Sequence, residues 1–410
     1  MHGFSVYISI DKPIGKVNFT WKPLFSFQGK HCLRRFDSTQ IAIEQYTAEK
    51  FIQEKLWIDN KDFFILTDGV VTNLKALRQA YKVNNNEELI SRISSKADFF
   101  NEFTGHFAGF IWYKTTNEFV VFNNHCGTKK VFYYTDEQTI LFSTDLFTLS
   151  RLLDNLNIVK SLDLDAAYLL LTSGFMHEDY TLIKQVKQLR AGEYSCLSNK
   201  KLLINNYFHL SNINENKDSE TDIITKLDKL FSKSVKLEFD QDNSTNLTAI
   251  TTLSGGLDSR MVALTAHKSG YNNQIFLNFS EKDYADEVIA KQIADKYHVD
   301  MFQIPLSAQG LCSIDEVIRV NDGLTLYTGA GHVFEALQNL ESFKNITNET
   351  TGFIHTGILG DAILGSYLNS ETKCKPLATD GLYSKGLFTK AENILQKSAD
   401  NYPTEELYKL

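Results

Sequence analysis

The sequence predicts two domains of different class, an α+β domain followed by an α/β domain. Through the first half, helices and short strands that pair as hairpins occur in separate runs, which is typical of a layered α+β domain. After a polar stretch, the second half alternates strand and helix, which is typical of a doubly wound parallel sheet. The length of 410 residues suits two or three domains that need no disulfides or metal ions to fold.

The charge balance argues against one broad class of function. The chain has 42 Lys and Arg against 50 Asp and Glu, so its formal net charge is −8. Proteins that bind nucleic acid through general electrostatic attraction usually carry an excess of basic residues, so we expect no nucleic-acid partner. A single small anion could still bind in a local pocket.

Cysteine usage and the apolar stretches indicate a compartment. The five cysteines are widely spaced and contain no Cys-x-x-Cys pair, which argues against a disulfide framework and against a zinc site. The first ten residues lack the basic and apolar regions of a signal peptide. The longest apolar stretch, near residues 166–171, is far shorter than the roughly 20 residues of a membrane helix. We therefore expect a cytoplasmic protein with no membrane contact.

The elements of the first half follow from residue type and spacing. Residues 4–10 form a short, β-prone strand. Helix formers at helical spacing predict three helices, at 47–55, 74–81 and 86–94. Two pairs of apolar runs separated by short polar loops predict two hairpins, 107–113 with 118–123 and 131–134 with 140–143.

A polar, charged segment separates the two halves. Residues 210–222 read LSNINENKDSETD, and from Asn214 onward they contain no large apolar side chain. This composition predicts a domain boundary. We divide the chain into a first domain at 1–210, a linker at 211–222 and a second domain at 223–410.

The second half has the alternation of a parallel sheet. Three strands are predicted at 247–253, 275–279 and 301–306, and a fourth at 353–355. Helices are predicted at 258–269, with Gly270 at the C-cap, and at 285–297. A last amphipathic helix is predicted at 389–399. Sheets of this type bind ligands at the carboxyl ends of their strands, where the helices begin.

The most informative segment lies between the first of these strands and its helix. It reads Leu253-Ser254-Gly255-Gly256-Leu257-Asp258-Ser259. The glycines permit close backbone approach, and the helix N-terminus presents amides to an anion. The serines add hydroxyl donors, and Asp258 would hold Mg²⁺ against phosphate oxygens. The segment lacks Gly-Lys-Ser/Thr and is not a Walker A loop. The alternative is a strand-to-helix turn that needs glycine for geometry alone.

This segment resembles the pyrophosphate loop of ATP pyrophosphatases, and the chain as a whole resembles the asparagine synthetase family. The resemblance runs from residue 1 to about residue 370. The second motif, Thr356-Gly357-Ile358-Leu359-Gly360-Asp361, is similar to the family's Ser-Gly-Glu-Gly-Ser-Asp segment and continues at 363–367. In the first half, three segments resemble the family's amidotransferase strands and turn: 103–110, 127–134 and 189–194.

The resemblance implies a fold and a set of binding residues. The first domain would have the αββα layers of an Ntn-type amidotransferase, and the second the sheet of an ATP pyrophosphatase. Leu253 and Phe279 would contact adenine, Thr356 and Gly357 would close over the nucleotide, and Asp258 and Asp361 would hold Mg²⁺. The implied ATP-binding set is Leu253, Ser254, Gly255, Gly256, Asp258, Ser259, Phe279, Thr356 and Gly357.

For two aspartates a purely structural role is an alternative to a role in the binding site. Asp361 could be a capping or turn residue. Asp286 is similar to an acidic residue that follows the family's second strand, but an N-cap aspartate is the interpretation we favour for it.

The first domain departs from the family where glutamine is hydrolysed. The family exposes a cysteine as residue 1, whose thiol is the nucleophile, and this chain has His2 after Met1. Asp68-Gly69-Val70 stands where the family has Asn-Gly-Glu, and Asn123-Asn124 stands where Arg-Asp is usual. Cys126 lies near this region, in a turn, and is a poor substitute nucleophile. We expect glutaminase activity to be absent, and we assign no catalytic residue.

The second domain departs from the family in two ways. Ile358 replaces the motif's glutamate, whose carboxylate in the family acts on the attacking amine. The natural carboxylate substrate therefore need not be aspartate. Only residues 371–410 follow the matched part, where the family continues further and supplies a lysine. We therefore expect a C-terminally truncated synthetase domain.

Three functions follow from the resemblance. The first is an ATP- and Mg²⁺-dependent ligase that adenylates a small-molecule carboxylate, releases pyrophosphate and transfers the acyl group to ammonia or an amine. The second is an incomplete or non-catalytic nucleotide-binding protein. The third is a glutamine-dependent asparagine synthetase of asparagine biosynthesis. A homodimer and a complex with a partner chain both stay open.

Overall fold

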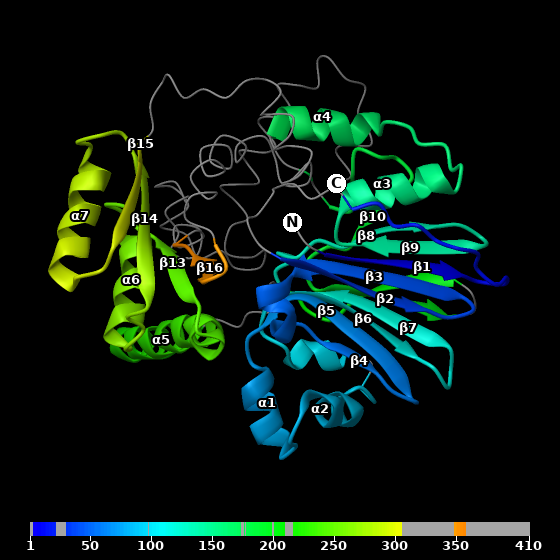
Figure 1. The fold of residues 1–410 in the computed structure, drawn as a ribbon, viewed down its shortest axis with the longest axis horizontal. Helices are drawn as coiled ribbons and strands as arrows, with labels where there is room; N and C mark the ends of the chain where they lie inside the picture. The colour runs from blue at the N-terminus through cyan, green and yellow to red at the C-terminus, as the bar shows by residue number, and fades with distance from the viewer. Residues whose placement is uncertain are drawn as a thin grey trace. The chain divides into compact units, whose positions relative to one another are not determined.

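The computed structural model describes residues 3–21, 30–96, 98–173, 176, 178–198, 201–209, 216–305 and 348–357. The chain divides into two compact units, which we describe separately. The first carries strands β1 to β12, and the second carries the elements from α5 to β16 (Figure 1).

Within its described residues, the first unit contains two six-stranded sheets in which all strand pairs are antiparallel. One sheet has the order β10-β8-β9-β1-β3-β2. Its strands are β1 (Gly3–Ser9), β2 (His31–Asp37), β3 (Ile41–Ala48), β8 (Phe132–Thr135), β9 (Thr139–Ser143) and β10 (Lys187–Gln188). The other has the order β12-β11-β7-β6-β5-β4. Its strands are β4 (Trp57–Asp59), β5 (Phe63–Val71), β6 (Gly105–Tyr113), β7 (Glu118–Asn123), β11 (Glu193–Ser198) and β12 (Lys201–Asn206).

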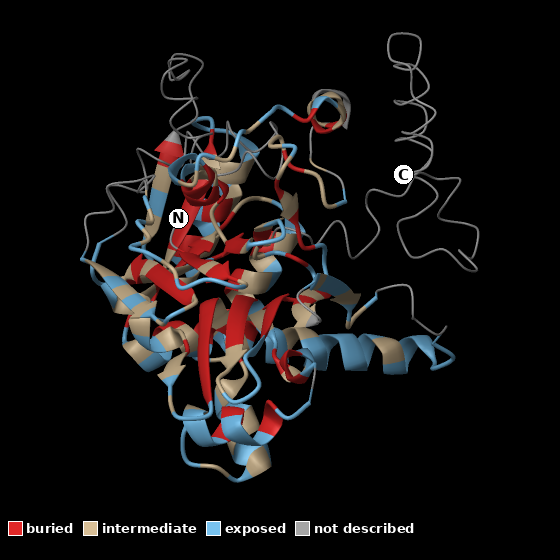
Figure 2. Cartoon of the chain, turned by 90° about the vertical axis from the view of Figure 1, so that its right-hand side faces the viewer, coloured by how far each residue is buried: buried red, intermediate tan, exposed pale blue. Residues whose placement is uncertain are grey.

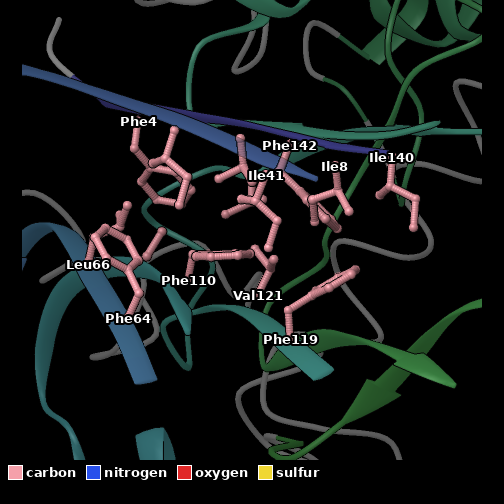
Figure 3. Close-up of a cluster of buried hydrophobic side chains, with 14 of the residues drawn as sticks. Phe4, Ile8, Ile41, Phe64, Leu66, Phe110, Phe119, Val121, Ile140 and Phe142 are labelled. Atoms are coloured by element: carbon pink, nitrogen blue, oxygen red, sulfur yellow. The ribbon is translucent and has the colours of Figure 1, made fainter. Parts of the chain in front are cut away.

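The core of this unit lies between the two sheets. Side chains alternate along a strand, so every second residue of each sheet faces the other sheet. Figure 3 shows the result, with Phe4 and Ile8 of β1 meeting Phe64, Leu66 and the β6 and β7 side chains. These side chains are almost fully buried, as are the central strands in Figure 2.

Helices cover the outer faces of both sheets. On the β5–β6–β7 sheet, α2 (Asn86–Ile93) buries its apolar face together with α1 (Leu74–Tyr81) and the 3₁₀ helix at Phe99–Glu102. On the other sheet, α3 (Leu146–Asn155) packs on β8 and β9. Helix α4 spans Leu164–Ser173. The layers therefore run helix, sheet, sheet, helix (Figure 1), which confirms the predicted αββα arrangement.

In the described part of the second unit, four parallel strands form a sheet in the order β15-β14-β13-β16. Its elements are α5 (Glu220–Thr245), β13 (Thr248–Thr252), α6 (Leu257–Lys268), β14 (Gln274–Ser280), α7 (Ala285–Tyr297), β15 (Met301–Pro305) and β16 (Thr351–His355). From β13 the chain adds β14 and β15 on one side, and β16 lies on the other side. The order therefore reverses at β13, which makes the β13–β16 edge a topological switch point, where sheets of this class bind ligands.

Most predicted elements are confirmed, and one is wrong. The helices predicted at 74–81 and 285–297, both hairpins, and the predicted parallel strands are present. The helix predicted at 47–55 is not. Thr47 and Ala48 end strand β3, because they pair with β2, and a 3₁₀ helix follows at Glu49–Glu54. The helix predicted at 389–399 lies outside the described residues.

Three further details refine the predictions. Helix α5 begins at Glu220, so the last residues of the predicted linker are helical. Helix α6 has Ser269 as its C-cap, and Gly270 follows with φ of +92°. Within the described part of the chain, no helix combines the length and apolar character needed to cross a membrane.

Candidate functional site

The segment from Leu253 to Ser259 joins β13 to α6 and is ordered by its own serines. The amide of Ser254 donates to Oγ of Ser259 at 3.0 Å, and the two hydroxyls lie 3.1 Å apart. The amide of Gly256 donates to Oγ of Ser254 at 3.1 Å. Gly256 is the N-cap of α6 and has no side chain to satisfy the first helical amides. Those amides are the orphan donors of a helix N-terminus, which attract an anion.

A carboxylate from the next helix holds this segment from outside. The amide of Gly255 donates to Oδ1 of Asp286 at 2.7 Å, and Nδ2 of Asn278 donates to the carbonyl of Leu253, also at 2.7 Å. A Cβ on Gly255 would lie 2.6 Å from that Oδ1, so any larger residue here would displace the Asp286 carboxylate from the amide. The N-cap interpretation of Asp286 is wrong. The N-cap of α7 is Tyr284, and Asp286 lies inside the first turn.

The two motifs singled out from the sequence meet in space. Strand β16 pairs with β13, with Thr251 opposite His355, so the residues after both strands emerge at the same edge. Gly357 lies against the first turn of α6, where a Cβ would come within 2.5 Å of the Ser259 amide nitrogen. The close approach of Gly357 to α6 therefore depends on the absence of a side chain.

Helix α6 carries one acidic side chain, Asp258, close to the carboxyl end of β13. It lies in the first turn of the helix, and among the described residues its carboxylate has no hydrogen-bond or ion-pair partner. An uncommitted carboxylate is the kind of oxygen ligand that Mg²⁺ prefers. Asp361 and Ile358 lie outside the described residues. Within the described ranges, no group of three or more His, Cys, Asp or Glu residues could hold a metal ion.

Leu253 and Phe279 occupy different environments. The side chain of Leu253 is buried in the cluster formed by α6, α7 and β14, and its amide donates to the Leu277 carbonyl at 2.8 Å. Phe279 is half-buried in β14, next to Ile304 of β15. The predicted contacts of both residues with adenine remain predictions.

In the first unit, Asp68, which differs from the family pattern, belongs to a buried cluster of ion pairs. Asp68 of β5 is 1 % exposed, and its two oxygens lie 2.9 Å from Nζ of Lys55 and 2.6 Å from Nζ of Lys129. Burial alone would raise the pKa of Asp68, but the charges of Lys129 and Lys55 outweigh it and hold that pKa well below its ordinary value. Burial in turn lowers the pKa of Lys55. Asp68 is therefore an ionised carboxylate committed to two lysines.

The other departures have structural partners. Nδ2 of Asn123 donates to the carbonyl of Arg190 at 2.8 Å, and Oδ1 of Asn124 accepts from the amide of Thr128 at 2.9 Å. Cys126 lies in a turn after β7, as predicted, and its side chain is exposed. His2 lies outside the described residues.

Sequence reasoning missed several of these contacts. Lys55 and Lys129 are far from Asp68 in the sequence, and no local pattern links them. Asn278 and Asp286 are the two residues that hold the segment after β13. A short polar side chain inside an apolar strand could have indicated Asn278.

Family models match both halves of the chain. Residues 53–208 match the model of a glutamine amidotransferase domain, and residues 226–368 match that of asparagine synthase. A curated relative, "Putative asparagine synthetase (glutamine-hydrolyzing) 2" of Methanocaldococcus jannaschii, is 25% identical over 222 residues. The aligned region is 52% of this chain and 42% of the relative, so less than half the length of that relative is matched.

Two solved structures are more distant neighbours. One is glutamine phosphoribosylpyrophosphate amidotransferase from B. subtilis complexed with ADP and GMP, at 8% identity and a TM-score of 0.29, over 77% of this chain and 67% of that one. The other is an allosteric regulatory enzyme of purine biosynthesis, at 10% identity and a TM-score of 0.29, over 73% and 78%. Scores this low support no functional argument.

Proposed function

Because the chain is a member of the asparagine synthetase family, we propose that it is an ATP-dependent ligase that forms an amide from a small-molecule carboxylate and ammonia or an amine. The observation that carries this proposal is the meeting of two motifs at the switch point of the parallel sheet. Gly357 lies against the first turn of α6, at Asp258 and Ser259 of the glycine-rich segment.

In this proposal a carboxylate oxygen of the substrate attacks the α-phosphorus of ATP. The bond to pyrophosphate breaks, and an acyl-adenylate remains. The nitrogen of the amine then attacks the acyl carbon and loses a proton to solvent, while the bond to AMP breaks. The products are an amide, AMP and pyrophosphate.

The protein's part in the first step is to bind and orient the phosphates. The unsatisfied amides at the start of α6 favour the negative charge that builds up on pyrophosphate. Asp258 would hold Mg²⁺ together with Asp361, and Mg²⁺ supplies charge neutralisation for the leaving pyrophosphate. Thr356 and Gly357 would close over the nucleotide from β16.

We propose further that the first unit does not hydrolyse glutamine. An asparagine side chain carries an N–H donor, whereas an ionised aspartate only accepts hydrogen bonds. Asp68 stands where the amidotransferase domains of the family have an asparagine, and Lys55 and Lys129 hold the Asp68 carboxylate ionised. The amine would then come from solution or from a second substrate, and the protein would work in the cytoplasm.

Two alternatives have their own support. The match of residues 53–208 to a glutamine amidotransferase domain favours a glutamine-dependent asparagine synthetase. The change at Asp68, with Ile358 in place of the motif's glutamate, favours a non-catalytic nucleotide-binding protein.

One assay separates these three. The purified protein is incubated with ATP, Mg²⁺ and a panel of carboxylates, with either ammonia or glutamine as nitrogen source, and AMP, pyrophosphate and glutamate are measured. AMP formed with ammonia and without glutamate release supports the ligase. Asparagine formed from aspartate with glutamine supports the glutamine-dependent enzyme. ATP binding without AMP from any acid supports the non-catalytic alternative.

A further inference from the structure

A buried aspartate joins α5 to the strand that carries the second motif. Asp242, near the end of α5, is 2 % exposed, and His355, the last residue of β16, is 7 % exposed. Oδ1 of Asp242 accepts from the amide of Phe353 at 2.7 Å, and Oδ2 lies 2.7 Å from Nε2 of His355. A carboxylate without a proton has only acceptor atoms, and when Asp242 is in that form Nε2 of His355 is the donor. Both oxygens are thus used on β16.

The packing around this contact leaves little freedom. The ring of Phe239, one turn earlier on α5, stacks on the His355 ring with centroids 3.8 Å apart and planes at 17°. A Cβ on Gly352 would lie 1.7 Å from Oδ1 of Asp242. Gly352 is therefore required for the carboxylate to reach the backbone of β16.

The carboxylate meets β16 at an irregularity in its pairing. Thr248 of β13 lies opposite Thr351, but Ile250 lies opposite Ile354, so β16 holds one extra residue over this stretch. A bulge leaves its extra residue out of the ladder and disrupts the pairing locally. The amide of Phe353 falls in this stretch and is the one that Asp242 accepts. Among the described strands, β16 also lies at the edge of the sheet and pairs only with β13.

The position of β16 determines where the second motif lies. Thr356 and Gly357 follow His355 directly, and Gly357 approaches Ser259 so closely that a shift of one residue would separate the two motifs.

We propose that Asp242 and His355 are positioning residues of the nucleotide site, because they fix the bulge of β16 and thereby place Thr356 and Gly357 against α6. This inference rests on the proposed function, since it assumes that the two motifs bind ATP. The side chains of Asp242 and His355 are buried and bond to one another, and Asp242 also bonds to the backbone of β16.

The test measures nucleotide binding and local stability in the same variants. Asp242→Ala and His355→Leu remove the contact, while His355→Gln keeps a side-chain N–H donor. Asp240→Asn is the matched control, because Asp240 also lies on α5 but accepts from the hydroxyl of Tyr271 at 2.7 Å. Affinity for a non-hydrolysable ATP analogue with Mg²⁺ is measured by calorimetry well below the melting temperature of each variant. Hydrogen exchange is followed over residues 351–357.

We expect Asp242→Ala and His355→Leu to weaken binding of the analogue at least tenfold and to speed exchange over residues 351–357. His355→Gln should recover part of the affinity, and Asp240→Asn should bind like the wild type. Variants that melt earlier yet bind with unchanged affinity would show a purely structural contact and overturn the inference. A wild-type protein that fails to bind the analogue would instead overturn the proposed function, and the inference with it.

Discussion

Oδ1 of Asp286 accepts the amide hydrogen of Gly255 at 2.7 Å, so a carboxylate from α7 fixes the loop that opens α6. The serines of the loop bond to one another and to neighbouring amides within the loop. The contact with Asp286 adds a hydrogen bond from a different helix and so restrains the loop from outside. It also commits one of the loop amides to the protein. The amides available to a phosphate are then those of the first turn of α6.

Removing this carboxylate should loosen the loop. Because the Gly255 amide is half-buried, we expect Asp286→Ala to lower the free energy of unfolding by about 0.5–1.5 kcal/mol, the range for the net contribution of one hydrogen bond, and to weaken ATP binding. Asp286→Asn keeps an acceptor at Oδ1 and should lose less. Chemical unfolding and calorimetry with an ATP analogue measure both effects. Equal behaviour of the alanine and wild-type proteins would argue against this role.

The two loop glycines should respond differently to alanine. In Gly255→Ala the new Cβ would lie 2.6 Å from Oδ1 of Asp286, whereas in Gly256→Ala its nearest neighbour is Oγ of Ser254 at 3.2 Å. We expect Gly255→Ala to weaken ATP binding by about tenfold or more, which corresponds to about 1.4 kcal/mol. Gly256→Ala should bind more tightly than Gly255→Ala. The reverse order would contradict the loop geometry.

Asp258 should affect Mg²⁺-dependent binding without affecting stability. Its carboxylate has no partner within the described part of the chain, so Asp258→Asn should change the free energy of unfolding by less than about 0.5 kcal/mol. Affinity for ATP should fall at millimolar Mg²⁺ and depend less steeply on Mg²⁺ concentration than in the wild type, because one of the two proposed ligands is lost. Asp295→Asn, at the far end of α7, is the control. A Mg²⁺ dependence in Asp258→Asn that equals that of the wild type would exclude Asp258 as a ligand.

The ion cluster of the first unit should stabilise the protein at neutral pH. Asp68→Asn leaves two partly buried ammonium groups without their carboxylate, and we expect a loss of about 3–5 kcal/mol in the free energy of unfolding. The exposed pair of Asp37 with Arg35 is the control, where Asp37→Asn should cost less than about 1 kcal/mol. A similar cost for both variants would contradict the proposed role of burial.

The same cluster predicts a pH dependence. The folded protein holds the pKa of Asp68 below that of the unfolded chain, which is near 3.8. A depressed carboxyl pKa stabilises the fold above the unfolded pKa, and the stabilisation is lost as pH falls below it. Between about pH 4 and pH 2, wild-type stability should therefore fall more steeply than that of Asp68→Asn. Parallel curves in urea titrations over this range would show that Asp68 is not responsible.

How far the fold could be predicted depended on whether local signals agreed with tertiary pairing. Helix α7 was predicted with its observed bounds, because its apolar spacing and helix formers point the same way. Strand β5 was not predicted, although it lies between β4 and β6 in its sheet. Its first residues are a continuous apolar run, which has no strand periodicity to detect. At the end of β3 the sequence predicts a helix, because the pairing of β3 with β2 cannot be detected from neighbouring residues alone.

The candidate site divides in the same way. The sequence by itself determined the glycine-rich segment, the second motif at Thr356 and Gly357, and the parallel sheet that carries them, because these depend on local residue type and spacing. Only the tertiary structure decided that Gly357 packs on α6, that Asp286 holds Gly255, that Asp242 holds the bulge of β16, and that Asp68 is closed between two lysines. Each of these contacts joins residues far apart in the chain, and a buried polar group finds its partner only when folding brings the two together.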